Sequence, residues 1–411
     1  MRGISLATVL VAATVLGGTA ASAGTFTTLH TFCHHGSCDD GAEPLEAPLI
    51  PDGRGNYLGT AEGGGVNDGG VLYTLAGGTK YRKLFDFPAA GGPIGSLIQD
   101  AQGNLFGVEE FGNTGQGAVF RLHPLNAKRT KWTYDVLYDF CPQSDSCPDG
   151  SRPLALTYDG AWSGVPYDGQ SPLYGTTDFG GKKGFGTVFQ LTDNGGTWSE
   201  NVIHSICSRK SCSDGKYGAF TLVNAPNGVL YSTTARGGGA KEGVVFKLTP
   251  NAGRTKWTQS VVYSFCALTN CSDGASPTGL ALDGQGGLYG LTEGGGDKGF
   301  GTIFQISAEG SFTSLHSFCQ QAGCPDGAAP PASPTVGPDG TLYGVTSLTL
   351  WSYAPQTSTY GVLHTFCADG KCKDGYEPTS TLTLAADGTI FGNTFSGGSS
   401  WNSGTVFSYL P

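Results

Sequence analysis

The sequence predicts an all-β protein, a seven-bladed β-propeller with four-stranded blades. Three observations lead to this prediction. A unit of similar sequence recurs seven times, each unit contains four short strand candidates, and the first strand candidate after the leader has no partner in its own unit. Repeated units of four short strands are typical of propeller blades.

The recurring unit is best followed at a Tyr-Gly step that precedes a Gly-rich loop. The glycine of this step, replaced once by serine, occurs at Gly59, Gly107, Gly175, Ser232, Gly290, Gly344 and Gly392. The fifth copy shows the strand order most clearly. A first strand follows Pro277, and residues 288–290, 301–304 and 315–318 lie in the second, third and fourth. Asp-Gly and Gly-rich turns separate these runs, as expected for antiparallel hairpins.

The two ends of the repeat region predict how the ring closes. Residues 25–32 read as a fourth strand with no first three, and residues 404–410 read as a third strand with no fourth. The N-terminal strand can therefore complete the last blade. Such closure removes the unpaired sheet edges that an open array would expose.

The N-terminal residues predict export. Arg2, the apolar run 4–16 and the small residues 21–23 have the pattern of a secretory signal peptide. We therefore assign residues 1–23 to a signal peptide and residues 24–411 to one propeller domain. The expected location is secreted or periplasmic.

Twelve cysteines behind a signal peptide predict disulfides. They occur in close pairs in six of the seven copies: Cys33 and Cys38, Cys141 and Cys147, Cys207 and Cys212, Cys266 and Cys271, Cys319 and Cys324, and Cys367 and Cys372. A bridge within each pair is the simplest interpretation. Metal-binding thiolates instead favour two-residue spacings and converging pairs.

Composition excludes some partners. The net charge of −10 and the low charged fraction of 14% argue against nucleic acid and against an anionic membrane surface. No apolar run after the leader is long enough to span a membrane. We expect a monomer that needs no cofactor.

The units at residues 173–177 and 186–191 resemble the GloVer (Gloeobacter/Verrucomicrobia-type) tandem repeat of exported proteins. The resemblance extends over nearly all of the chain after the leader. It implies export and a propeller, and it implies no catalytic residues.

Strand order predicts one candidate face. In an antiparallel blade, the loop between the second and third strands emerges on the same side as the connection to the next blade. The Gly-rich loops and the cysteine loops should therefore share a face, and loops on a rigid scaffold often carry function. Residues that differ between the copies are the informative ones there.

Carboxylates are prominent among these differences. One loop position carries Glu62, Glu110, Asp178, Ala235, Glu293, Ser347 and Phe395, and Glu109 precedes Glu110. One interpretation is a solvated acidic rim beside lysines. The other is a cluster in which Glu62, Glu109, Glu110 and Asp178 are candidate catalytic groups, with Glu62, Glu110 and Asp178 as candidate Ca²⁺ ligands. Further candidate binding residues are Glu293, Arg236, Trp351, Trp401, His34 and His35. The two tryptophans either stack on sugar rings or pack between blades.

Residues that recur at one position of the repeat are expected to be structural. The Asp after each cysteine pair should cap the turn there, and His30, His204, His316 and His364 should pack within the blades. Three functions remain open. The first is a secreted binding propeller for an extracellular polysaccharide or surface ligand, the second a polysaccharide lyase or glycoside hydrolase, and the third a structural envelope protein.

Overall fold

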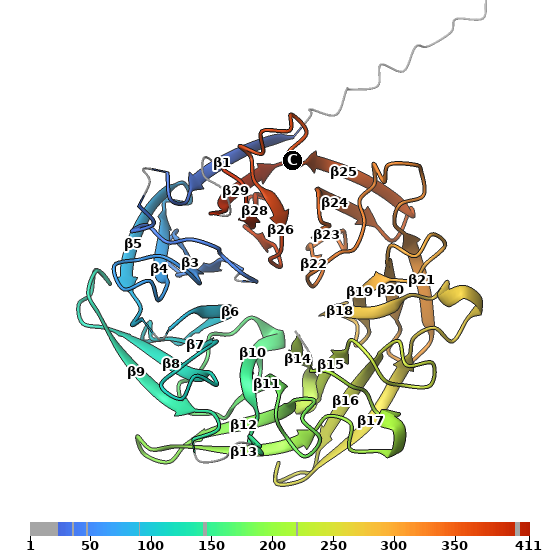
Figure 1. Cartoon of the computed structure of the whole chain (residues 1–411), viewed down its shortest axis with the longest axis horizontal. Helices are drawn as coiled ribbons and strands as arrows, with labels where there is room; N and C mark the ends of the chain where they lie inside the picture. Colours follow the sequence, from blue (N-terminus) through green and yellow to red (C-terminus); the bar gives the residue numbers. More distant parts are fainter. Residues whose placement is uncertain are drawn as a thin grey trace, which may run out of the picture.

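The computed structural model is a closed ring of seven antiparallel sheets around a central axis (Figure 1). It describes residues 24–34, 37–46, 48–89, 91–142, 146–218, 221–398 and 403–411. The all-β, seven-bladed prediction is confirmed. The predicted signal peptide, residues 1–23, lies outside the described residues.

Each blade runs from an inner strand at the axis to an outer strand at the rim. Blade 1 contains β2 (Ile50–Pro51), β3 (Tyr57–Ala61), β4 (Val71–Ala76) and β5 (Lys80–Asp86). Blade 2 contains β6 (Pro93–Gln99), β7 (Leu105–Glu109), β8 (Ala118–Pro124) and β9 (Trp132–Asp139). Blade 3 contains β10 (Ser151–Tyr158), β11 (Leu173–Phe179), β12 (Thr187–Asp193) and β13 (Trp198–Ser205). Blade 4 contains β14 (Leu222–Asn224), β15 (Leu230–Thr234), β16 (Val244–Pro250) and β17 (Trp257–Ser264).

The remaining blades follow the same order. Blade 5 contains β18 (Ala275–Leu282), β19 (Leu288–Gly294), β20 (Thr302–Ile306) and β21 (Phe312–Ser317). Blade 6 contains β22 (Thr335–Val336), β23 (Leu342–Val345), β24 (Thr349–Ala354) and β25 (Thr359–Thr365). Blade 7 contains β26 (Tyr376–Pro378), β27 (Thr383–Leu384), β28 (Ile390–Ser396), β29 (Thr405–Leu410) and β1 (Thr25–Thr31). Single 3₁₀ turns η1 to η4 lie at Ala161–Ser163, Lys210–Cys212, Pro226–Gly228 and Thr269–Cys271. Within the described ranges, no helix has the length and apolar character needed to cross a bilayer.

Ring closure follows the prediction. β1 pairs antiparallel with β29, from Thr25 opposite Leu410 to Thr31 opposite Thr405. The N-terminal strand thus forms the outer strand of blade 7 (Figure 1). This pairing joins the two ends of the ring, so blade 7 has the same four layers as the other blades.

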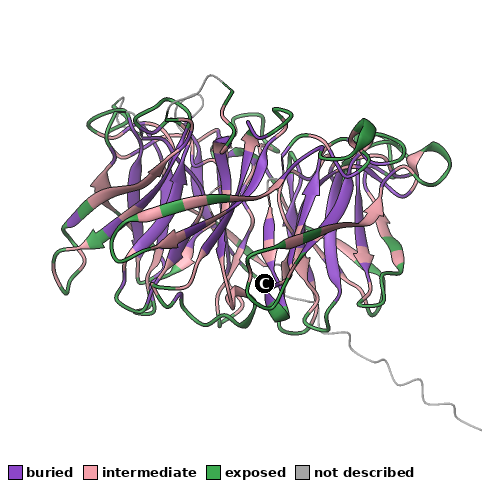
Figure 2. Ribbon diagram, turned by 90° about the horizontal axis from the view of Figure 1, so that it is seen from below, coloured by how far each residue is buried: buried purple, intermediate pink, exposed green. Residues whose placement is uncertain are grey.

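The Tyr-Gly step recurs because it makes room for an aromatic ring. A Cβ atom on Gly290 of β19 would lie 2.2 Å from Cζ of Phe304, which is opposite it on β20. Gly344 makes the same room for Trp351, and Gly392 for Phe407. These rings are fully buried, and the buried residues form the interiors of the blades (Figure 2). The glycine and the ring are therefore one packing unit.

The six predicted disulfides are all present, and each closes a short loop between neighbouring blades. The bonded pairs are Cys33 with Cys38, Cys141 with Cys147, Cys207 with Cys212, Cys266 with Cys271, Cys319 with Cys324, and Cys367 with Cys372. Among the described residues no cysteine is left free. The pairing predicted from the spacing of the cysteines is therefore confirmed in every one of the six loops.

The Asp that follows each cysteine pair holds the loop closed. Asp273 accepts hydrogen bonds from the backbone N–H groups of Ala267 and Leu268 at 2.9 and 3.2 Å, and from the Tyr263 hydroxyl at 2.8 Å. On β25 of blade 6, His364 takes the place of the tyrosine and bonds to Asp374 at 2.8 Å. The structural role predicted for these aspartates and histidines is confirmed.

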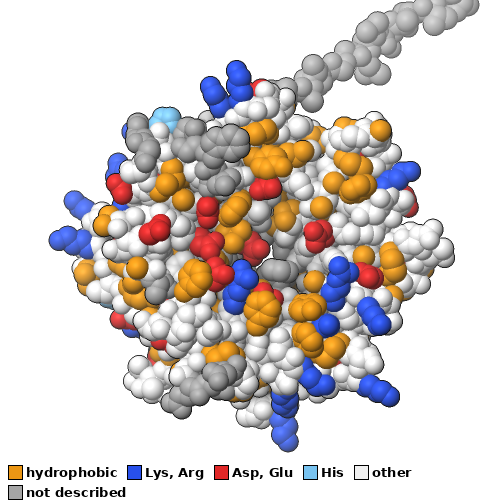
Figure 3. Space-filling view, in the orientation of Figure 1, with side chains coloured by type: hydrophobic (Ala, Val, Ile, Leu, Met, Phe, Trp, Pro, Cys, Tyr) orange, Lys and Arg blue, Asp and Glu red, His pale blue; other side chains and the backbone are white. Residues whose placement is uncertain are grey.

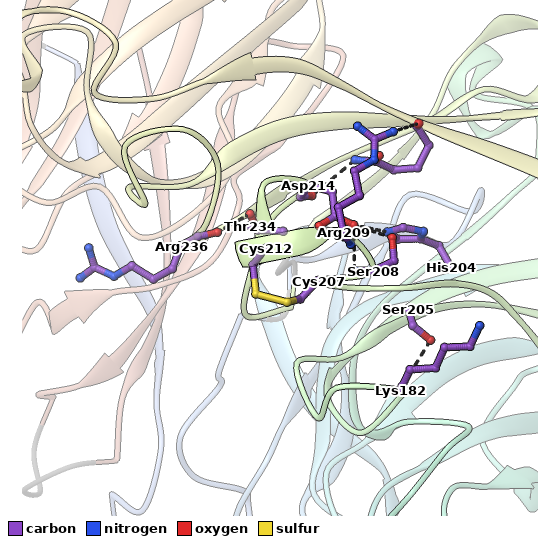
Figure 4. A network of polar contacts seen from close by, with 11 residues as sticks. Lys182, His204, Ser205, Cys207, Ser208, Arg209, Cys212, Asp214, Thr234 and Arg236 are labelled. Carbon is purple, nitrogen blue, oxygen red and sulfur yellow. Dashed lines mark hydrogen bonds and ion pairs between the residues drawn. A yellow bond between two sulfur atoms is a disulfide. The ribbon is translucent and has the colours of Figure 1, made fainter.

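The same network in blade 4 is shown in Figure 4. Asp214 accepts hydrogen bonds from the Ser208 N–H at 2.8 Å and from the Arg209 N–H at 3.1 Å, beside the Cys207–Cys212 disulfide. Burial lowers the pKa of His204 to about 4, so this ring is neutral at physiological pH. The side chain of Arg236 extends away from this network.

Candidate functional site

The cysteine loops and the Gly-rich loops share one face, as predicted. In blade 1 the N–H of Gly65 donates a hydrogen bond to the carbonyl of Cys38 at 2.8 Å. The same bond, also 2.8 Å, joins Gly181 to Cys147 in blade 3. We call this side of the ring the Cys-loop face. Acidic side chains gather on it around the central opening (Figure 3).

Three of the predicted carboxylates converge there. Arg152 contacts both Glu110, at 2.9 Å, and Asp178, at 3.7 Å. Glu62 lies beside Glu110, and the negative charge of Glu110 disfavours a charge on Glu62. Burial, together with this neighbour, raises the pKa of Glu62 to about 8, so Glu62 favours its protonated form at neutral pH. We call Glu62, Glu110 and Asp178 with Arg152 the rim cluster.

Arg152 was not singled out from the sequence, although a signal for it exists. It stands directly before the proline of the Asp-Gly-x-x-Pro segment, where the first copy has Glu43. Both residues have positive φ, 54° and 55°, because the chain turns sharply there onto the inner strand. A comparison of this position between the copies would have shown that its residue type varies, as it does at the predicted carboxylate position nearby.

Glu109 does not belong to the rim cluster. It is only 1% exposed, and its carboxylate accepts a 2.7 Å hydrogen bond from the hydroxyl of Tyr134 on β9. In blade 5 the same position is Thr292, which bonds to Thr302 on the next strand. Blade 2 has Ala118 there instead, which leaves room for the longer carboxylate. The expectation that Glu109 joins the neighbouring carboxylates is thereby corrected.

Other predicted binding residues are dispersed. Glu293 is exposed on blade 5, and within the described part of the chain no ion pair or hydrogen bond links it to the rim cluster. Arg236 pairs with Glu242 on its own loop. His34 is exposed in a shallow groove with β1, on the outer side of blade 7. His35 and Trp401 lie outside the described residues.

Trp351 is fully buried, at 0% exposure. Its ring packs against Phe318 and Tyr360 and fills the space above Gly344. It takes the position that Phe304 has in blade 5. The interpretation of Trp351 as a platform for sugar rings is therefore wrong, and packing inside the blade is its role.

The rim cluster lacks the arrangement of a metal site. Among the residues that the structure describes, no group of three or more His, Cys, Asp or Glu side chains is placed to hold a metal ion. Arg152 already supplies a positive charge to Glu110 and Asp178. The arrangement does not support the predicted Ca²⁺ ligands.

Two hollows open beside the rim cluster. The first is a groove of about 410 Å³ between blades 1 and 2, with Glu43, Glu62 and Asp68 among its walls. Four glycines contribute to its lining, and the ring of Phe111 stands at its edge with 47% of its surface exposed. We call it the blade 1–2 groove.

The second hollow is the central channel, a cavity of about 400 Å³ lined by the inner strands of the blades. Its lining is mostly aliphatic and hydroxyl-bearing. Glu46 is the only ionisable residue in the part of the lining that the structure describes. Glu46 also went unnoticed in the sequence, since it lies in an irregular stretch between Pro44 and β2.

Exposed aromatic rings are concentrated on the Cys-loop face. Among the described residues, rings with more than a third of their surface exposed occur on the loops and strand ends of this face, at Phe111, Phe179, Tyr217, Phe300 and Tyr376. Trp162, in the loop between β10 and β11, is the one such ring described on the opposite face. The Cys-loop face thus combines rings, carboxylates and hollows.

Comparisons with solved structures bear on the fold. The extracellular domain of a putative hybrid two-component system from B. thetaiotaomicron is 12% identical, with a TM-score of 0.56 over 90% of this chain and 40% of that one. The extracellular domain of a putative one-component system from the same organism is 14% identical, with a TM-score of 0.57 over 94% and 41%. A puromycin-hydrolyzing peptidase from Mycobacterium tuberculosis is 14% identical, with a TM-score of 0.51 over 87% and 51%.

The chain therefore spans about two fifths of the first two structures and half of the third. At these identities the likeness shows a shared propeller fold and no shared activity. No curated protein sequence matches the chain. The profile described as the Gloeobacter/Verrucomicrobia repeat matches residues 162–407, which is more than half of the sequence. The match includes the Tyr-Gly steps of copies three to seven, and the chain belongs to the Gloeobacter/Verrucomicrobia repeat family.

Proposed function

We propose that this protein is an exported binding propeller that holds an extracellular polysaccharide against its Cys-loop face. The observation that carries the proposal is the blade 1–2 groove. Its lining combines the exposed ring of Phe111 with the carboxylates of Glu43, Glu62 and Asp68 and with four glycines. The apolar face of a sugar stacks on an aromatic ring, and carboxylates accept hydrogen bonds from its hydroxyl groups.

Export is part of the proposal. Six disulfides support it, because such bonds persist in oxidising compartments outside the cytosol. The predicted leader supports it as well. The extracellular origin of two of the structural neighbours fits this placement.

Binding is favoured over glycoside hydrolysis by the geometry of the rim cluster. Glycosidases hold their two carboxyl groups about 5 Å apart or farther, so that a sugar or a water fits between them. Glu110 and Asp178 are instead both engaged by Arg152, at 2.9 and 3.7 Å. The guanidinium of Arg152 therefore stands where a sugar or a water would have to lie between these two carboxylates.

The test is a glycan array followed by titration of the best ligand, with the disulfide-bonded protein. We expect Phe111→Ala to weaken binding by about tenfold, the usual loss for one stacking ring. Trp162→Ala is the matched control, since that ring is exposed on the opposite face. Glu62→Gln should weaken binding, and neither the wild-type protein nor this variant should release cleaved glycan.

Two results would count against the proposal. The absence of any glycan ligand would favour the structural envelope interpretation. Release of shortened glycan by the wild-type protein, lost in Glu62→Gln, would favour the lyase or hydrolase interpretation.

A further inference from the structure

The central channel contains a carboxylate that the proposed groove does not use. Glu46 lines the channel, whereas the blade 1–2 groove is lined by other residues. No described residue gives the Glu46 carboxylate a hydrogen bond or an ion pair. Desolvation is the main cause that raises the pKa of Glu46 to about 7, and Arg152 offsets this only in part. Glu46 is thus half-buried in the channel lining, and no described residue serves as its hydrogen-bond or ion-pair partner.

The rest of the channel lining provides hydroxyl groups. Ser96, Thr278, Ser333, Thr335 and Thr381 contribute to it from four different blades. Some are already paired: Thr335 donates to the carbonyl of Leu382 at 2.7 Å, across the boundary between blades 6 and 7. The Thr379 hydroxyl is different, because it is buried in the lining without a hydrogen-bond partner.

The charge around the channel mouth selects the ligand class. Asp178 lies close enough to raise the pKa of Glu46, and the rim cluster carries three carboxyl groups against one arginine. A negative mouth of this kind attracts cations. Since no described group is arranged to ligate a metal, the matching cation is an organic ammonium with directional N–H donors.

We propose that the central channel is a second binding site, which takes a primary ammonium group on a small hydroxyl-rich body, with Glu46 as its counter-charge. Unpaired lining groups such as Thr379 bond to the hydroxyls of that body. A volume of about 400 Å³ is within the usual range for small-molecule pockets. A free amino sugar and an amino-sugar unit of a polysaccharide share this chemistry.

The site is tested by calorimetry of the disulfide-bonded protein with glucosamine and N-acetylglucosamine. Acetylation removes the positive charge and keeps the sugar ring, so only glucosamine should bind. We expect Glu46→Gln to weaken glucosamine binding by about tenfold or more, the effect of losing a charge-assisted contact. Thr379→Val should weaken it several-fold and provides a second variant if Glu46→Gln does not fold.

Glu309→Gln is the matched control, because that carboxylate is fully exposed on the turn between β20 and β21. Equal affinity for the two sugars, or unchanged glucosamine binding in folded Glu46→Gln, would overturn the inference. A glucosamine oligosaccharide separates the two sources: binding of the oligosaccharide alone assigns the site to the polymer, and binding of the monomer assigns it to the free sugar. Phe111→Ala should leave this binding unchanged, so the channel site and the proposed groove succeed or fail separately.

Discussion

Glu109 provides the sharpest test of how burial acts in this fold. Its carboxyl is 1% exposed, has one partner in Tyr134, and has a second oxygen that is buried without a hydrogen bond. Burial raises its pKa from 4.5 to about 7. The folded protein therefore binds a proton that the unfolded chain releases, and stability falls as pH rises from about 4.5 to about 7.

The size of this effect follows from the two pKa values. A rise from 4.5 to about 7 corresponds to a loss of up to roughly 3 kcal/mol of unfolding free energy above pH 7. Glutamine has nearly the same shape, cannot ionise, and can still accept the hydrogen bond from Tyr134. Glu109→Gln should therefore stabilise the protein by up to about 3 kcal/mol at pH 8 and change little at pH 4.5.

The assay is equilibrium unfolding in guanidinium chloride at pH 4.5, 6 and 8, with the disulfides intact. The exposed Glu309→Gln variant is the control and should not be more stable than wild type at pH 8, because the hydrogen bond from Ser307 lowers the pKa of Glu309 and favours its charged form. A Glu109→Gln protein that is less stable than wild type at pH 8 would refute the reasoning, as would a difference independent of pH. Glycan binding should be unaffected, because Glu109 does not reach the Cys-loop face.

Three further predictions concern the repeat. Gly290→Ala should destabilise by about 1–3 kcal/mol in thermal or chemical unfolding, because its Cβ would overlap a buried ring; Gly361→Ala, where the nearest neighbour would be 3.5 Å away, should have little effect. Asp273→Ala should cost roughly 2–4 kcal/mol, since it leaves two backbone N–H groups of a cysteine loop without their acceptor, and stability equal to wild type would contradict this. Replacing Cys266 and Cys271 together by Ala should lower the unfolding free energy by about 2 kcal/mol, the loop-entropy value for so short a loop, with unchanged glycan affinity as the check on a purely structural role.

Much of the architecture could be predicted because the same sequence unit occurs seven times. A Gly and the ring it accommodates, or an Asp and the loop it closes, recur at the same spacing in nearly every copy. Local contacts of this kind depend on residues close in sequence. Ring closure could also be predicted, because the unpaired strand at residues 25–32 complements the incomplete last blade.

The candidate site could be predicted from the sequence only in part. Glu62, Glu110 and Asp178 were predicted together because they occupy one repeat position in successive blades. Glu109 was misassigned, since adjacent residues on a strand point to opposite sides and this one points into the blade. Trp351 was open to two interpretations, and its burial decided between them.

The sequence by itself therefore determined the blade, the number of blades, the disulfides and the face on which the variable loops lie, because each depends on a pattern repeated within about one blade. Only the tertiary structure placed Arg152 between Glu110 and Asp178 and placed Glu46 in the channel. These positions depend on contacts between blades, where residues from different copies meet around the axis and no repeated spacing links them.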